Sequence, residues 1–133
     1  MSAEENTKIV KQTYEAFLRG DIESLLKLYS LDIQWEIYGP ASIPTAGVRR
    51  GHEELGRFFA MVNEVLEVKK FEPQEFIAQD NQVAVVGRYE WRVKTTGRAF
   101  NSNWVHVVTL NGGKITRFRE YVDTAAGVEA FAG

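Results

Sequence analysis

The strand-like segment 114–122 places a carboxylate where an apolar side chain is expected. Alternation along it puts Thr116, Phe118, Glu120 and Val122 on one face. Burying a carboxylate on a largely apolar face is costly unless the group is paired or protonated. Glu120 is therefore the first candidate for acid–base chemistry.

The preceding segment, 98–110, offers a histidine as the partner of Glu120. If 111–113 forms a three-residue hairpin loop, Trp104 lies opposite Glu120, and His106 is its diagonal neighbour at roughly 7–8 Å between backbones. An apolar site raises a carboxyl pKa, and a nearby histidine can share the proton. The pattern predicts a catalytic pair of His106 and Glu120. A buried ion pair with a structural role, adding little stability, is the alternative.

Aromatic side chains predict a pocket wall around this pair. The same register brings aromatic residues of 82–94 and 98–110 to one side. Aromatic walls with a few polar groups suit a flat, apolar ligand, and a filled core is the alternative. The predicted ligand-binding residues are Tyr14, Trp35, Ile37, Tyr89, Trp91, Ser102, Trp104, Phe118 and Val122.

The remaining polar candidates are not expected to take part in catalysis or metal binding. The chain has two histidines and no cysteine, and without an evident third ligand neither a metal site nor a cofactor is expected. His52 is interpreted as a surface or capping residue where a helix begins, and Asp32 as a turn residue.

Periodicity and turn residues place helices early and strands late in the chain. In the first helix Val10, Tyr14, Phe17 and Leu18 share the face predicted to be buried. This order predicts one α+β domain over 1–133, with helices on one face of a curved sheet that encloses the pocket. The expected elements are a helix from Ser2 to Gly20, a short helix after Asp21, a strand over 33–37, a loop over 39–50, a helix over 52–68, and antiparallel strands near 69–79, 82–94, 98–110 and 114–122.

Composition narrows the partners and the compartment. With 44% hydrophobic residues and a net charge of -2, the chain has no basic excess for binding nucleic acid. No apolar run is long enough to span a membrane, and no signal peptide is evident, so a cytoplasmic location is expected. The outer face of the last strand is predicted to meet solvent or a second subunit; it carries Ile115, Arg117, Arg119, Tyr121 and Asp123.

Segments along the whole chain carry a resemblance to a known family. They are Tyr14–Phe17, Gly20–Asp21, Gly51–Glu54, Gly113–Thr116 and Arg119–Asp123. With them the chain resembles the nuclear transport factor 2-like superfamily, above all its SnoaL-like and ketosteroid isomerase-like branches. The resemblance implies a curved, mixed sheet forming a cone closed by three helices, and a homodimer joined through the outer sheet face. Because this fold hosts isomerases, cyclases, hydrolases and non-enzymes, it does not imply one reaction.

Roles carried over from these branches separate them. In ketosteroid isomerases an aspartate on the first strand is the catalytic base, and a tyrosine in the first helix helps to form the oxyanion hole. These positions fall on Ile37 and Thr13 here, which argues against that mechanism. In limonene-epoxide hydrolases an arginine and two aspartates activate water. Glu120 matches one of the aspartates, but the other two positions fall on Tyr89 and Gly87. In SnoaL-like cyclases the histidine and aspartate pair falls on His106 and Glu120, which lengthens the acidic arm by one methylene.

These observations lead to three hypotheses. The first is cofactor-free acid–base chemistry on a hydrophobic, cyclic or carbonyl-bearing substrate, with Glu120 moving a proton and His106 pairing with it or polarising an oxygen. The second is a non-catalytic binding module with the same pocket. The third is a structural dimer with a filled core.

Overall fold

The structure is a computed structural model that describes residues 2–133. Six strands form one mixed, open sheet in the order β2-β1-β6-β5-β4-β3, and β1 runs parallel to β6 while every other neighbouring pair is antiparallel. The expected α+β class is confirmed. The elements are α1 (Ala3–Arg19), α2 (Ile22–Leu26), β1 (Tyr29–Ile37), β2 (Gly47–Arg50), α3 (Gly51–Val65), β3 (Leu66–Gln79), β4 (Gln82–Val93), β5 (Ala99–Asn111), β6 (Lys114–Val122) and α4 (Thr124–Phe131).

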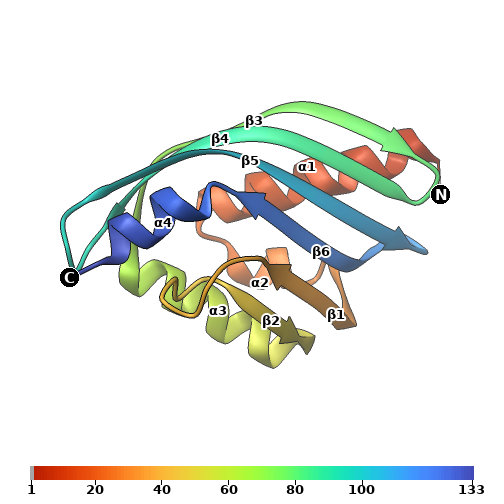
Figure 1. The fold of residues 1–133 in the computed structure, drawn as a ribbon. Coiled ribbons are helices and arrows are strands. Elements are labelled where there is room, and N and C mark those ends of the chain that lie inside the picture. The colour runs from red at the N-terminus through yellow and green to blue at the C-terminus, as the bar shows by residue number, and fades with distance from the viewer. Residues whose placement is uncertain (1) are drawn as a thin grey trace.

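The sheet curls around its helices (Figure 1). Its long strands β3 and β4 pack against α1, whereas β1 and β2 pack against α3. α4 follows β6 and packs against β5 at the end of the molecule where the C-terminus lies (Figure 1). Buried side chains from the helices and from the inner sheet face form one hydrophobic core, so the residues predicted to face the pocket lie within this core layer.

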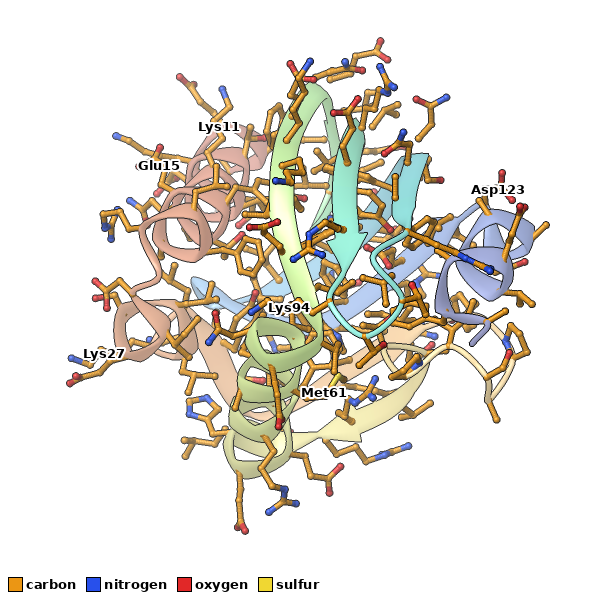
Figure 2. All side chains as sticks on the ribbon, turned by 90° about the vertical axis from the view of Figure 1, so that its left-hand side faces the viewer. Lys11, Glu15, Lys27, Met61, Lys94 and Asp123 are labelled. Atoms are coloured by element: carbon orange, nitrogen blue, oxygen red, sulfur yellow. The ribbon has the colours of Figure 1, made fainter. Side chains whose placement is uncertain are left out.

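The amphipathic helix α1 has its expected start and a narrower buried face than predicted. Ser2 and Glu5 form the capping box, each side chain accepting a hydrogen bond from the other residue's backbone N–H. Figure 2 shows Lys11 and Glu15 on the outward side of the helix. Leu18, predicted to be buried, is 53% exposed because it falls on the edge of the solvent face.

Several boundaries differ from the sequence prediction. The strand expected over 33–37 begins at Tyr29, so Asp32, interpreted as a turn residue, lies within β1. The helix expected over 52–68 ends at Val65, because Leu66–Val68 pair with Trp91–Val93 as the start of β3. The loop expected over 39–50 contains the short edge strand β2, paired with β1. A fourth helix, α4, follows β6, and Asp123 caps it by accepting a hydrogen bond from the Ala126 N–H instead of extending the strand.

The β5–β6 hairpin has a different register from the predicted one. Asn111 pairs with Lys114 across a two-residue turn, and the pairing shifts by one residue between Leu110 and Thr109. This bulge places Ile115, predicted to face outward, in the core at 2% exposure. Beyond it, His106 lies directly opposite Glu120 and not diagonal to it.

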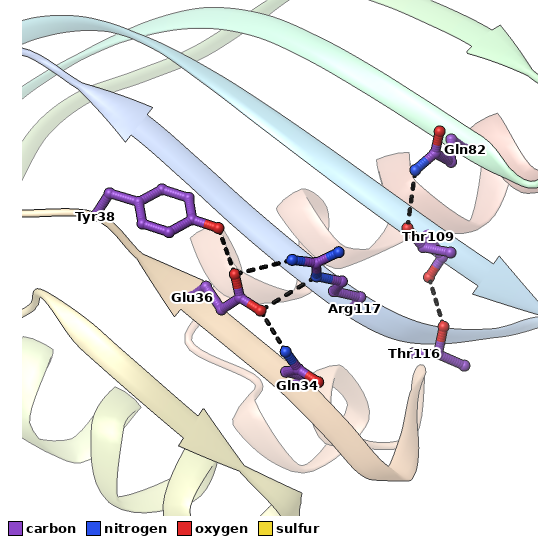
Figure 3. A network of polar contacts seen from close by, with 7 residues as sticks. All are labelled: Gln34, Glu36, Tyr38, Gln82, Thr109, Thr116 and Arg117. Atoms are coloured by element: carbon purple, nitrogen blue, oxygen red, sulfur yellow. Dashed lines mark hydrogen bonds and ion pairs between the residues drawn. The ribbon is translucent and has the colours of Figure 1, made fainter.

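The outer sheet face carries a polar network around the buried carboxylate of Glu36 (Figure 3). Arg117 donates two hydrogen bonds of 3.2 Å to the Glu36 carboxylate, and Tyr38 and Gln34 donate to the same group. The Arg117 guanidinium, with Tyr38, lowers the pKa of Glu36 to about 2. Beside this network the half-exposed rings of Tyr38 and Tyr121 lie 4.9 Å apart. Pairing of two chains through this face stays a prediction.

Among the helices of residues 2–133, none is both long enough and apolar enough to cross a membrane.

Candidate functional site

A chain of hydrogen bonds links three buried side chains from α1, β5 and β6. The Tyr14 hydroxyl lies 2.9 Å from His106 Nδ1, and His106 Nε2 lies 2.8 Å from Glu120 Oε1. His106 is 3% exposed and Glu120 is 9% exposed. The two residues predicted as a catalytic pair are therefore in direct contact. Tyr14, predicted only as a ligand contact, is bonded to the far side of the imidazole.

The protonation of this cluster follows from its burial and its partners. Burial lowers the pKa of His106 even though the neighbouring Glu120 carboxylate acts in the opposite sense, so the imidazole is neutral at neutral pH. Burial also raises the pKa of Tyr14 well above its usual range. A neutral imidazole that donates from Nε2–H to the carboxylate must accept at Nδ1. We therefore assign the Nε2–H tautomer, with Tyr14 donating to Nδ1.

Aromatic rings fix the orientation of the imidazole. Trp104 stacks on His106 at 4.0 Å between ring centroids with an angle of 20°, and Phe118 lies 4.5 Å away. Gly87 leaves the space that Trp104 occupies, since a Cβ at this position would lie 2.3 Å from the indole. A rigid stack and two hydrogen bonds hold His106 in one orientation.

A cavity of about 90 Å³ lies between the helices and the inner sheet face. One ordered water needs roughly 10–15 Å³, so this space has room for several waters. Ionisable side chains in its wall are those of Tyr29 and Tyr89 besides the hydrogen-bonded cluster; neither lysine nor arginine lines it among the described residues. The predicted site residues in its wall are Tyr14, Trp35, Ile37, Tyr89, Trp91, His106, Phe118 and Glu120.

The other predicted contact residues have different places. Trp104 is 1% exposed and lies behind His106, outside the cavity lining. Ser102 is buried and connects β5 to the start of α4: its hydroxyl donates to the Asn103 carbonyl and accepts from the Asp123 N–H. Val122 packs against the edge of the core and also lies outside the lining.

Comparison with known proteins places the chain in a family. The family model described as "SnoaL-like domain" matches residues 10–118. The chain belongs to the SnoaL-like family.

The chain is also similar along nearly its whole length to solved structures and to a protein known by sequence. An NTF2-like protein from Burkholderia xenovorans LB400 is 42% identical, with 99% of each chain covered and a TM-score of 0.92. The structure of TerC co-crystallised with polyporic acid is 30% identical, with 96% of this chain and 98% of that chain covered and a TM-score of 0.83. An uncharacterised protein of Mycobacterium tuberculosis H37Rv is 27% identical over 135 residues, with 98% of each sequence covered.

Sequence reasoning missed part of the cavity wall of this SnoaL-like domain. The helix α3 was expected, but its side chains Phe58, Phe59 and Val62 were not predicted to line the cavity. On the strands, the signal was alternation: Phe71 pairs with Tyr89, and Phe100 pairs with Trp91, so both follow from the faces of residues already predicted to point inward. The cavity-lining residues that were not predicted, on helices, strands and one loop, are Thr13, Phe17, Leu25, Tyr29, Thr45, Phe58, Phe59, Val62, Leu66, Phe71 and Phe100.

The second histidine of the SnoaL-like domain lies apart from the cluster. His52 opens α3, and its Nε2 lies 3.0 Å from the Tyr29 carbonyl oxygen, which ties the helix start to β1. Within residues 2–133 no three His, Cys, Asp or Glu side chains gather in a way that could hold a metal ion.

Proposed function

We propose that this protein is a cofactor-free acid–base enzyme that acts on an uncharged, hydrophobic ring compound bearing a carbonyl group, with Glu120 as the base. The observation that carries the proposal is the position of Glu120, hydrogen-bonded to His106 in the wall of a largely apolar cavity. Membership of the SnoaL-like family supports it, because the resemblance to SnoaL-like cyclases implies that their acid–base pair falls on these two residues.

The two oxygens of Glu120 have different surroundings. Oε1 accepts the hydrogen bond from His106 Nε2–H. Oε2 makes no hydrogen bond within residues 2–133 and is not fully enclosed by protein atoms. The bond to Oε1 orients the carboxylate and leaves Oε2 to face a ligand. A base held in this way needs little reorganisation in the transition state.

The proposed step is a proton transfer that balances within the site. Glu120 Oε2 takes a proton from the carbon next to the carbonyl. The electron pair of the broken C–H bond forms a carbon–carbon double bond, and the carbonyl π pair moves to the oxygen as an enolate. Return of a proton from the Glu120 carboxyl to carbon completes an isomerisation, or the enolate attacks an electrophile within the same molecule.

The TerC structure gives separate support for an organic ligand in this fold, because TerC was co-crystallised with polyporic acid and is 30% identical to this chain. The second candidate function of the same cavity is to bind a small molecule without turnover. The two functions differ in one observable, the exchange of protons on the bound compound.

The experiment uses 2-indanone, an uncharged, flat ring ketone with acidic protons next to its carbonyl. In D₂O, deuterium incorporation at these carbons is followed by NMR with wild type and with Glu120→Gln, which keeps an oxygen for the His106 hydrogen bond. We expect wild type to accelerate exchange and the variant to lose at least about 100-fold of that acceleration.

The matched control is Glu36→Gln, which changes a buried glutamate on the outer sheet face, and it should exchange like wild type. Binding of 2-indanone without accelerated exchange would support the binding module instead. Equal exchange by wild type and Glu120→Gln would contradict the assignment of the base.

A further inference from the structure

Tyr89 is a buried phenol that lines the cavity without a hydrogen-bond partner. It lies on β4 and is 4% exposed. Within residues 2–133 its hydroxyl makes no hydrogen bond, whereas the hydroxyls of Tyr14 and Tyr38 bond to His106 and Glu36. Buried tyrosine hydroxyls usually find a partner, so an unpaired one in a cavity wall indicates that a ligand supplies the missing acceptor.

The hydroxyl of Tyr89 retains access to open space. The indole nitrogens of Trp35 and Trp104 also lack a partner within the described chain, but they are completely enclosed by protein atoms, whereas the Tyr89 hydroxyl is not. The side chain lines the same cavity as Glu120. Burial raises the pKa of Tyr89, and the nearby Glu120 carboxylate adds to this effect, so the phenol keeps its proton and acts as a donor.

The ring of Tyr89 is held by other aromatic side chains. Its centroid lies 5.6 Å from that of Trp91 and 5.7 Å from that of Phe100, both in edge-to-face geometry. On the backbone its partner across the sheet is Ser102. A donor fixed in this way keeps its direction when a ligand enters, which is the condition for stabilising a developing negative charge.

We propose that Tyr89 is a second catalytic residue, whose hydroxyl binds the carbonyl oxygen of the substrate while Glu120 removes the proton from the adjacent carbon. This assignment rests on the proposed function and narrows its substrate class to uncharged ring ketones. The C–H pair moves into the carbon–carbon bond, the carbonyl pair moves to oxygen, and the resulting enolate oxygen accepts the Tyr89 hydrogen bond. Because no lysine or arginine of the described chain lines the cavity, a carboxylate or phosphate has no counter-ion there.

The test compares 2-indanone with indane, which has the same ring skeleton without the oxygen. Affinities of both compounds are measured by ligand-observed NMR for wild type and for Tyr89→Phe. We expect wild type to prefer the ketone, and Tyr89→Phe to lose about 3- to 10-fold of this preference while its affinity for indane is unchanged. Deuterium exchange of 2-indanone should fall by about 100-fold in the same variant.

Controls separate a ligand contact from a structural effect. Unchanged indane binding shows that the cavity of Tyr89→Phe is intact. Tyr121→Phe removes a hydroxyl from the outer face, where Tyr121 is 44% exposed, and should leave both the ketone preference and the exchange rate at wild-type values.

Failure of this inference and failure of the proposed function give different results. If Tyr89→Phe keeps both the ketone preference and the exchange rate while Glu120→Gln loses exchange, the role of Tyr89 is wrong and the proposed function stands. If Tyr89→Phe loses the preference but Glu120→Gln exchanges like wild type, Tyr89 binds the ligand and the base is wrong. If wild type binds neither compound, both proposals are contradicted.

Discussion

Replacement of Gly87 by alanine tests the packing that positions His106. A Cβ at this position lies 2.3 Å and 2.6 Å from two carbons of the Trp104 ring and 2.7 Å from the Glu72 carbonyl oxygen. Carbon atoms in contact are normally 3.5–4.0 Å apart. Neither a fully buried indole nor a strand carbonyl can move aside easily, so the clash must be relieved by shifting the core.

The expected cost follows from this overlap. Overpacking a core by one methyl group costs about 1–3 kcal/mol, and the two rigid neighbours place Gly87→Ala near the upper end of this range. Because Trp104 stacks on His106 at 4.0 Å, its displacement also disturbs the hydrogen bond to Glu120. We expect Gly87→Ala to lose about 3 kcal/mol of unfolding free energy and most of the exchange activity.

Urea denaturation measures the loss as a lower midpoint with an unchanged slope. Gly56→Ala is the matched control: this glycine lies within α3, and a Cβ added there would come no closer than 3.9 Å to the side chain of Leu26. The control should gain about 0.5–1 kcal/mol from helix propensity. In a Trp104→Phe background, which removes the outer part of the indole, Gly87→Ala should cost at least about 1 kcal/mol less. A cost that is negligible, or identical in both backgrounds, would refute the reasoning.

The remaining predictions concern the outer sheet face. The pKa of Glu36 is lowered to about 2 by Arg117 and Tyr38, so the group binds protons more weakly in the folded chain than in the unfolded chain. The stability that it contributes, roughly 1–3 kcal/mol after allowance for the half-exposed Arg117, is present above pH 4.5 and is lost as pH falls towards 2. Glu36→Gln should flatten this acid limb in urea titrations at several pH values, and an unchanged limb would contradict the assignment. For the same face we expect a homodimer in sedimentation equilibrium, because the rings of Tyr38 and Tyr121 are exposed side by side there. Tyr121→Glu should dissociate that dimer, whereas a wild-type monomer would show the prediction to be wrong.

The alternation of side chains made the sheet faces predictable even where the register was wrong. The β5–β6 prediction contained two one-residue errors: the turn has two residues and not three, and the bulge adds one more shift. Their sum is two, which preserves the face of every residue beyond the bulge. The prediction therefore placed His106 and Glu120 on the correct face but made them diagonal neighbours. Ile115 lies before the bulge, where only one shift applies, and its predicted face was wrong.

Other parts of the fold had weak local signals. β2 has four residues and gains its structure from pairing with β1. α4 contains a glycine in its interior, although Asp123 before it is a good capping residue. The bond between Tyr14 and His106 joins residues 92 positions apart. Such a contact depends on how α1 packs across the sheet, and no local pattern predicts it.

The most direct test of the central claim is NMR of the imidazole nitrogens during titration with 2-indanone. The chain contains two histidines, one in the cluster and one at the start of α3, so ¹⁵N-histidine labelling gives two rings, assigned with His52→Gln. We expect His106 to be the neutral Nε2–H tautomer at neutral pH and its nitrogen signals to shift on binding, while those of His52 stay unchanged. Signals of His106 that do not move at a saturating ketone concentration would contradict the claim that the cavity beside Glu120 is the reactive site.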